Sequence, residues 1–265
     1  MKIFILNILD FIFARKFFLP INIIFLKLFI RFIGYNHNIS INKNGESKFL
    51  KKICNENPEL CIDIGANIGN YSKFILNNSN SRVIAFEPIP TSHKKLTILK
   101  KKYPKRFFNY KFAIGEKNQN GKIYFDKKNL HWSTLSENVR KINYLKNLNN
   151  SINCKVKTLD SFLTTIKNIK IKRLDLIKID TEGNELEVLL GAKKTIKRYK
   201  PKYIQLEYNW HHLFKNVSLY HLSKLLNGYS VYKIFPYGQN LVKIDPQKPE
   251  NNYFNYLNIF FIKKR

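Results

Sequence analysis

Short apolar runs alternate with amphipathic segments along most of the chain. The runs have the length and β-branched composition of buried strands, and the segments between them show helical spacing, as at Leu186, Leu189 and Ile196. This alternation predicts an α/β fold with a mostly parallel sheet, and the hairpin-like tail predicts an antiparallel edge. The predicted strands cover 60–64, 82–86, 107–113, 122–125, 156–159, 173–180, 203–206, 229–235, 241–244 and 257–262. The predicted helices cover 47–55, 71–77, 186–196 and 219–226, and two more begin at Pro90 and with Asp160 as the cap.

Acidic residues end four of the predicted strands. They are Asp63, Glu87, Asp180 and Glu207. The carboxyl ends of parallel strands meet at one edge of a sheet, where open α/β folds bind their ligands. Because buried carboxylates cost free energy unless they are paired or bound to a ligand, four of them at one edge indicate a functional site.

A glycine turn follows the first of these strands. Gly65 and Gly69 frame it, and glycine there permits positive φ and a close approach of a ligand. Asn67 replaces the middle glycine of a dinucleotide-binding turn, and Asp63 would repel a pyrophosphate but suits an ammonium group. The turn alone also fits an ordinary strand-to-helix connection. Glu87, 24 residues after Asp63 (87 − 63), is placed to hold a ribose diol and favours a site for S-adenosylmethionine, which has both groups.

The chain is strongly basic, with a formal net charge of +29 and a pI near 9.9. Nucleic acid, an anionic membrane or an acidic substrate would each suit this charge. The basic residues are dispersed among abundant Asn, Ile, Phe and Tyr, so we favour a compositional bias as the larger cause. The three cysteines form no Cys-x-x-Cys motif, which argues against a zinc or disulfide framework and fits a cytoplasmic protein.

Residues 1–35 are apolar but interrupted by charges. The longest uncharged run, Phe17 to Leu26, is half of the ~20 residues that span a bilayer. Two helices lying in the membrane interface, or helices packed on the domain or on a partner subunit, both fit this pattern. We favour peripheral contact with the inner face of the membrane. The predicted organisation is an N-terminal helical extension and linker, 1–56, followed by one domain, 57–265.

A polar, asparagine-rich segment, 129–150, separates two predicted strands. It contains His131 and Trp132, which suit contact with a sugar or a base. A surface loop with a short helix and a substrate-facing insertion fit this segment equally well.

Five motifs along residues 60–207 resemble those of the FkbM-type family of S-adenosylmethionine-dependent methyltransferases. They are Asp63–Ser72, Ala85–Pro88, Ala113–Gly115, Val156–Asp160 and Asp175–Glu185, and Gly191, Ala192, Pro201 and Glu207 complete the pattern. The resemblance implies a class I, Rossmann-like methyltransferase fold: a mostly parallel seven-stranded sheet with an antiparallel last strand and helices on both faces. It also implies O-methylation, often of a sugar hydroxyl in a glycan, cell-surface polysaccharide or related metabolite.

The same resemblance implies roles for cofactor-binding residues. Asp63, Gly65 and Asn67 would hold the methionine end of S-adenosylmethionine, within the turn that Gly69 closes. Glu87 would hold the ribose. The stretch around Phe112 and Ala113 would flank the adenine.

Methyl transfer to a hydroxyl benefits from a general base, because a hydroxyl is a poor nucleophile. Asp180 is the first choice for this base, and Glu182 and His131 are alternatives. Asp180, Glu182 and Glu207 also offer the oxygen ligands that Mg²⁺ prefers. We favour the explanation that Glu182 caps the next helix, where negative charge is stabilising, and assign no metal ligands.

Two other functions compete with glycan O-methylation. An RNA methyltransferase would use the positive charge, but Asp180-Thr181-Glu182-Gly183 stands where many amino-group methyltransferases have an Asn-Pro-Pro-Tyr motif. A membrane-associated scaffold without activity would have no need of the intact cofactor motifs. The sequence therefore favours the O-methyltransferase.

Overall fold

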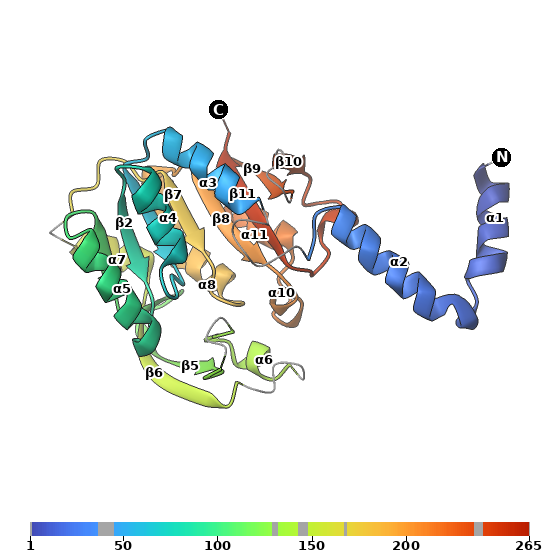
Figure 1. The fold of residues 1–265 in the computed structure, drawn as a ribbon, viewed down its shortest axis with the longest axis horizontal. Helices are drawn as coiled ribbons and strands as arrows, with labels where there is room; N and C mark the ends of the chain where they lie inside the picture. Colours follow the sequence, from blue (N-terminus) through green and yellow to red (C-terminus); the bar gives the residue numbers. More distant parts are fainter. Residues whose placement is uncertain are drawn as a thin grey trace.

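The computed structural model describes residues 2–36, 45–128, 132–142, 148–166, 169–235 and 241–264. These residues form an α/β domain around one large sheet (Figure 1). The strands of this sheet are β1 (Leu60–Ile64), β2 (Arg82–Phe86), β3 (Phe107–Tyr110), β7 (Leu176–Ile179), β8 (Tyr203–Tyr208), β9 (Tyr229–Ile234), β10 (Leu241–Ile244) and β11 (Leu257–Lys263). Their order is β10-β9-β11-β8-β7-β1-β2-β3.

The large sheet is mostly parallel, as predicted. β3, β2, β1, β7 and β8 pair in parallel, and β11 lies antiparallel between β8 and β9. The described sheet has eight strands rather than seven, because β10 pairs antiparallel with β9 at the edge. The strand order reverses between β1 and β7, which is where open α/β sheets bind ligands.

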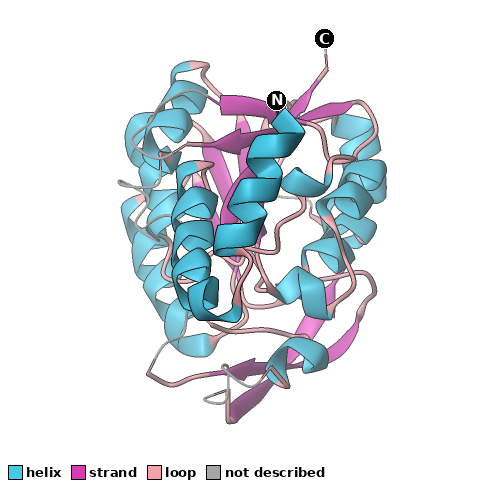
Figure 2. Ribbon diagram, turned by 90° about the vertical axis from the view of Figure 1, so that its right-hand side faces the viewer, coloured by secondary structure: helices cyan, strands magenta, loops and turns pink. Residues whose placement is uncertain are grey.

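Helices cover both faces of the sheet (Figure 2). Successive strand side chains point to opposite faces, so Ile62 and Ile64 join one core cluster and Cys61 joins the other. The helices on the Cys61 face are α3 (Glu46–Asn55), α4 (Asn70–Asn78) and α5 (Pro90–Lys102). The helices on the other face are α7 (Leu159–Thr165), α8 (Glu185–Leu190), α9 (Lys193–Tyr199) and α11 (Leu219–Leu225). Each fully buried Ile or Leu contributes about 1.5–3 kcal/mol to this packing.

The structure has a second, three-stranded sheet that the sequence did not predict, and it begins within the predicted strand 107–113. The run 107–113 splits, because β3 ends at Tyr110 and the next residues pair with a different sheet. This sheet has the order β4-β6-β5, from β4 (Ala113–Ile114), β5 (Gln119–Phe125) and β6 (Asn150–Lys157). With the short helix α6 (Glu137–Arg140), it lies beyond the carboxyl end of β2 in Figure 1.

The predicted helix 186–196 is two helices, α8 and α9. Gly191 ends α8, and its carbonyl oxygen accepts a hydrogen bond from the backbone N–H of Asp160. The carboxylate of Asp160 accepts from the N–H groups of Lys194 and Thr195, at the start of α9. Asp160 was expected to cap the helix α7, but Thr158 is the N-cap residue of that helix. Long-range contacts therefore divide the segment.

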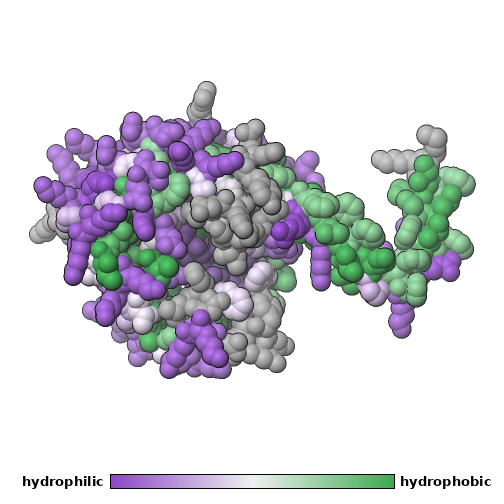
Figure 3. Space-filling model, in the orientation of Figure 1, coloured by the Kyte–Doolittle hydropathy of each residue, from purple (hydrophilic) through white to green (hydrophobic). Residues whose placement is uncertain are grey.

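The N-terminal helices α1 (Lys2–Phe13) and α2 (Leu19–Phe32) extend away from the domain (Figure 1). Their apolar side chains are exposed, and they cover this projection in the space-filling view (Figure 3). Among the described residues, no helix combines the length and the apolar character needed to cross a membrane. The remaining elements are η1 (Lys16–Phe18), α10 (His211–Phe214) and η4 (Pro249–Asn251).

Candidate active site

A cavity of about 970 Å³ lies at the carboxyl ends of the central strands. The turn after β1, the tip of β2 and the ends of β7 and β8 line it, together with residues of the small sheet. Ligand cavities usually measure ~300–1,000 Å³, so this one has room for a cofactor and a second substrate. The predicted site residues in its wall are Gly65, Asn67, Glu87, Ala113, Asp180 and Glu182, with Glu207 beside them.

The glycine turn brings β1 and β7 close together. Gly65 has a φ of +78°, and a Cβ built there would be 1.8 Å from the carbonyl oxygen of Asp180. The N–H groups of Gly65 and Ala66 both donate to the carbonyl of Phe86, at 3.1 and 3.0 Å. Asn67 also has positive φ, +49°. Only glycine fits at position 65, and the close approach sets Asp180 against the turn.

Glu87 lies at the tip of β2, where the sequence placed it. Its two carboxylate oxygens accept hydrogen bonds of 2.8 Å from the N–H groups of Asn67 and Ile89. The side chain is buried, and this burial raises the pKa of Glu87 to about 7 despite the two hydrogen bonds, which lower it. The turn therefore holds the Glu87 carboxylate at the cavity wall.

Asp63 and Gly69 lie beneath this wall rather than in it. The side chain of Asp63 is fully buried, accepts a 2.6 Å hydrogen bond from Ser72, and lies 3.6 Å from the ammonium group of Lys178. The predicted direct contact between Asp63 and a bound ammonium group does not match this placement. Gly69 is the N-cap residue of α4, and a Cβ there would be 2.6 Å from Leu96.

Lys178 connects the buried Asp63 to the cavity. Its ammonium group lies 2.9 Å from Asp180 and over the ring of Tyr71. Burial alone would lower the pKa of Lys178, but the carboxylates of Asp180, Asp63 and Glu46 outweigh it and raise the pKa. Lys178 therefore stays charged, and it positions the Asp180 carboxylate.

The expected adenine region is only partly in the cavity wall. Ala113, Ile114 and Ile123 provide an apolar surface there. Phe112 does not line the cavity, because its ring packs among the rings of Phe86, Tyr110 and Phe162. The structure therefore places Phe112 in the core next to the cavity wall and not in the wall itself.

Three carboxylates meet at the ends of β7 and β8. One oxygen each from Asp180, Glu182 and Glu207 lies within 4.8 Å of the other two, and we call these three residues the acidic cluster. Glu207 accepts a 2.7 Å hydrogen bond from the amide of Asn209. Burial, together with the charges of Asp180 and Glu182, raises the pKa of Glu207 well above its ordinary value.

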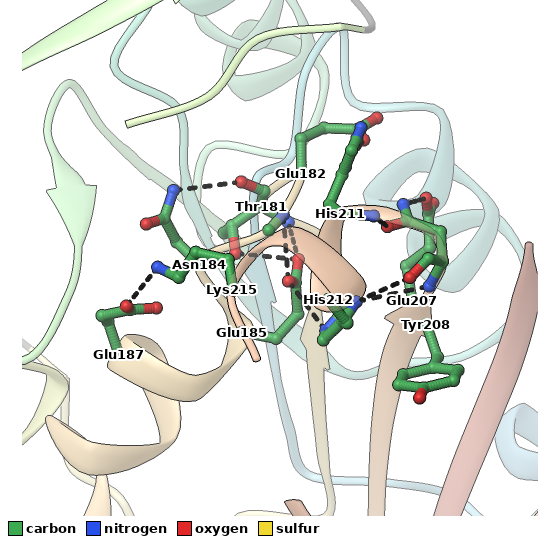
Figure 4. Close-up of polar contacts among 12 residues, drawn as sticks. Thr181, Glu182, Asn184, Glu185, Glu187, Glu207, Tyr208, His211, His212 and Lys215 are labelled. Atoms are coloured by element: carbon green, nitrogen blue, oxygen red, sulfur yellow. Dashed lines mark hydrogen bonds and ion pairs between the residues drawn. The ribbon is translucent and has the colours of Figure 1, made fainter. Parts of the chain in front are cut away.

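Glu182 does not cap the following helix. It has a φ of +53°, and its carboxylate lies 3.2 Å from the Nδ1 atom of the buried His211 (Figure 4). The N-cap residue of that helix is Asn184, and the carboxylate of Glu185 accepts from the N–H groups of Thr181 and Gly183 in the turn before it. The capping explanation for Glu182 was therefore wrong, and its side chain belongs to the cavity.

The family model for the methyltransferase FkbM domain matches residues 63–231, which is more than half of the 265 residues. The chain belongs to the FkbM methyltransferase family. It is a methyltransferase, and its cofactor is S-adenosylmethionine. No curated protein matches the chain.

Several solved methyltransferase structures are similar to this FkbM-family chain. A precorrin-6y C5,15-methyltransferase from Geobacter metallireducens GS-15 is 14% identical, with 86% of this chain and 95% of that chain covered and a TM-score of 0.43. An rRNA methylase from Streptococcus thermophilus is 10% identical, with 86% and 100% covered and a TM-score of 0.45. An O-methyltransferase from Bacillus cereus in complex with SAH is 10% identical, with 97% and 96% covered and a TM-score of 0.39.

The segment 129–150 contributes to the cavity of this methyltransferase. Trp132 and Ser133 line it, which agrees with the interpretation of a substrate-facing insertion. His131, the third candidate for the general base, lies outside the described residues.

Sequence reasoning missed several residues of the methyltransferase cavity. Asn36, Tyr256 and Asn258 reach it from opposite ends of the chain, and no local signal marks them. Asn209 and Trp210, which follow β8 directly, also line it, and the next residue, His211, contacts Glu182 from outside the wall. One local signal was available for this segment. Aromatic and histidine residues stand side by side just after a strand that ends in an acid, and this pattern is typical of a functional site.

Proposed function

We propose that this methyltransferase transfers a methyl group to a hydroxyl, most specifically a sugar hydroxyl of a glycan or cell-surface polysaccharide. The acidic cluster supports this proposal best, because it lies in the same cavity as Glu87. An acid-rich site can take up the proton that a hydroxyl loses on methylation. Trp132 lines the same cavity, and its ring suits the apolar face of a sugar.

We infer the cofactor-binding residues from the cavity wall. Glu87 would accept hydrogen bonds from the ribose hydroxyls, and Ala113 would flank the adenine. Gly65 and Asn67 would lie along the methionine end, where the absence of a Cβ at Gly65 fits the crowded backbone. Asp63 would act through Lys178 and Ser72 rather than by direct contact.

The proposed reaction is a displacement at the sulfonium methyl group. The acceptor oxygen forms a bond to carbon, the carbon–sulfur bond breaks, and sulfur keeps the electron pair as a thioether. The cofactor supplies the reactive methyl group, while the protein aligns the acceptor and takes up its proton. Asp180 and Glu182 are the proposed proton acceptors, with Lys178 orienting Asp180.

We further propose that the helices α1 and α2, the N-terminal arm, bring the acceptor from a membrane surface. Asn36, just after α2, lines the cavity and exchanges hydrogen bonds with Tyr256, which also lines it. Helices that expose this many large apolar side chains call for a nonaqueous partner. The position of the arm beside the cavity fits an acceptor held at a membrane, such as a lipid-linked glycan.

Methyl transfer from isotopically labelled S-adenosylmethionine tests the proposed acceptor class. The purified chain would be incubated with lipid-linked oligosaccharide, soluble polysaccharide and RNA from the host. We expect label in the glycan as an O-methyl ether, and a loss of at least 100-fold in rate for Glu182→Gln. Glu137→Gln, at an exposed position outside the cavity, is the matched control. Label in RNA alone would refute glycan O-methylation.

A further inference from the structure

We propose that the carboxylate of Glu46 holds the α-ammonium group of the cofactor. Glu46 is the first residue of α3 and lines the cavity. It precedes residues 63–231, which match the family model, so the family resemblance assigns it no role. This inference rests on the proposed contact between Glu87 and the ribose for the direction of the cofactor, but it does not depend on the acceptor.

The ammonium group of the cofactor needs a carboxylate that it can reach from the cavity, because a charge removed from water costs free energy unless it is paired. Asp63, the residue that the sequence favoured for this contact, is 0% exposed and lies outside the cavity wall. Glu46 is 7% exposed and lies in the wall. Glu46 can therefore make the contact that the burial of Asp63 prevents.

Lys178 is a positive group near Glu46, but two other carboxylates share it. Its ammonium group lies 2.9 Å from Asp180 and 3.6 Å from Asp63, and the charge of Glu46 also raises its pKa. One ammonium group among these carboxylates leaves an excess of negative charge at the cavity wall, which favours a positively charged ligand. S-adenosylmethionine brings two positive groups, the α-ammonium and the sulfonium.

A buried hydrogen-bond network holds the Glu46 carboxylate in place. The hydroxyl of Tyr71 donates a 2.7 Å hydrogen bond to the side-chain oxygen of Gln205, and the amide nitrogen of Gln205 donates to Oε1 of Glu46. The same nitrogen also donates, at 3.3 Å, to Oδ1 of Asn258, which lines the cavity. A carboxylate has about four sites that accept hydrogen bonds, so Glu46 keeps capacity for a ligand.

The helix α3 fixes the position of Glu46 from the other side. Gly45, with a φ of +86°, precedes Glu46, and Leu50 and Ile53 anchor the helix in the core. Negative charge is favourable at the start of a helix, which by itself accounts for an acid here. It does not account for the placement of this acid in the wall of the cofactor cavity.

The length of the cofactor matches this placement. The bonds from C4′ of the ribose to the ammonium nitrogen reach about 7 Å when extended, as two residues of backbone do. Neighbouring strands are about 4.8 Å apart. From a ribose at Glu87, on the tip of β2, this reach passes β1 and extends toward β7. The strand β7 carries Lys178, the neighbour of Glu46.

Calorimetric titration of the full chain with two ligands tests the inference. The ligands are S-adenosylhomocysteine and S-adenosyl-4-thiobutyrate, which lacks only the α-amino group. The wild-type chain should bind the first about tenfold more tightly than the second. Glu46→Gln should weaken binding of the first about tenfold and leave that of the second within about twofold. Glu56→Gln is the matched control, because it removes the same charge at the other end of α3, outside the cavity.

Equal weakening of both ligands by Glu46→Gln would overturn the inference, because Glu46 would then support the fold of the cavity rather than the ammonium group. Equal affinity of the wild-type chain for the two ligands would overturn it as well. Glu87→Gln should weaken both ligands alike, since both contain the ribose, so a failure of the ribose contact is seen separately. No acceptor is present in this experiment, and glycan O-methylation would stand after either negative result.

Discussion

At the scale of single residues, Glu87 combines a sequence signal with an unusual environment. The end of β2 places its carboxylate in the cavity, and the N–H groups of Asn67 and Ile89 hold both oxygens. Burial raises its pKa to about 7, so its charge changes in the neutral range. A carboxylate that accepts ribose hydrogen bonds must be ionised to do so fully.

This environment predicts a pH-dependent cofactor affinity. If the ionised form of Glu87 binds the ribose, protons compete with the cofactor below the pKa of about 7, and affinity falls as pH falls. Calorimetry should show S-adenosylhomocysteine binding about tenfold more weakly at pH 6 than at pH 8. Glu87→Gln should bind weakly at both pH values, with no such difference.

The control for this experiment is Glu137→Gln, which removes an exposed carboxylate and should keep the wild-type pH profile. A tenfold pH effect that persists in Glu87→Gln would assign the titration to another group and remove Glu87 from the ribose contact.

At the scale of elements, the break between α8 and α9 shows how packing overrides a helical pattern. Leu186, Leu189 and Ile196 keep helical spacing through the break. Gly191 nevertheless packs against the small sheet, and a Cβ there would be 2.0 Å from the carbonyl oxygen of Gly115. The contact joins the chain after β4 to the end of α8, and thereby holds the small sheet beside the large one.

This contact predicts a stability cost for Gly191→Ala. Gly191 has a helical φ of −78°, so the cost would come from overpacking alone, about 3 kcal/mol. Gly228→Ala is the matched comparison, because Gly228 has a φ of +94° and open space around it, and would cost about 1 kcal/mol through backbone strain. Urea denaturation measures both values. Equal costs would show that close packing at Gly191 is unimportant.

At the scale of the whole molecule, the N-terminal arm presents apolar side chains and basic residues together. Between Lys2 and Tyr35 the chain has five basic residues and one acid, Asp10. Lys27 and Arg31 are exposed one turn apart on α2. Such helices bind at anionic membrane interfaces through the burial of apolar surface and through the attraction of their basic residues to anionic lipids. We therefore interpret the arm as the membrane-binding element.

The arm predicts binding to anionic vesicles that depends on particular basic residues. Each Lys or Arg near such a surface contributes about 1 kcal/mol, so Lys27→Ala with Arg31→Ala should weaken binding about 25-fold. Cosedimentation with vesicles containing phosphatidylglycerol would measure this. Lys101→Ala with Lys102→Ala, on the exposed end of α5, lowers the net charge equally and should have little effect. Equal losses in both double variants would point to net charge rather than to the arm.

Local residue patterns determined the parallel strands and the acids at their tips. Short apolar runs predicted the core strands β1, β2, β7 and β8 correctly. A strand with both faces buried needs apolar residues at nearly every position, and this makes it easy to recognise in the sequence. The glycine turn and Glu87 follow from local geometry, because positive φ and a strand end are properties of a few consecutive residues. For the same reason the FkbM family was recognisable from its motifs.

Only the tertiary structure decided which residues share the cavity. Asp63 and Glu87 each stand at the end of a predicted strand, so the sequence does not distinguish them. In the structure Asp63 is buried below the cavity wall in contact with Ser72 and Lys178, whereas Glu87 lines the cavity. Asn36 and Tyr256 are far apart in the sequence but form a hydrogen bond. His211, the first residue of α10, contacts Glu182. Pairings of this kind depend on the packing of distant segments, which no local pattern encodes. The sequence by itself thus determined the fold and the cofactor class, and packing decided the surroundings of the acidic cluster.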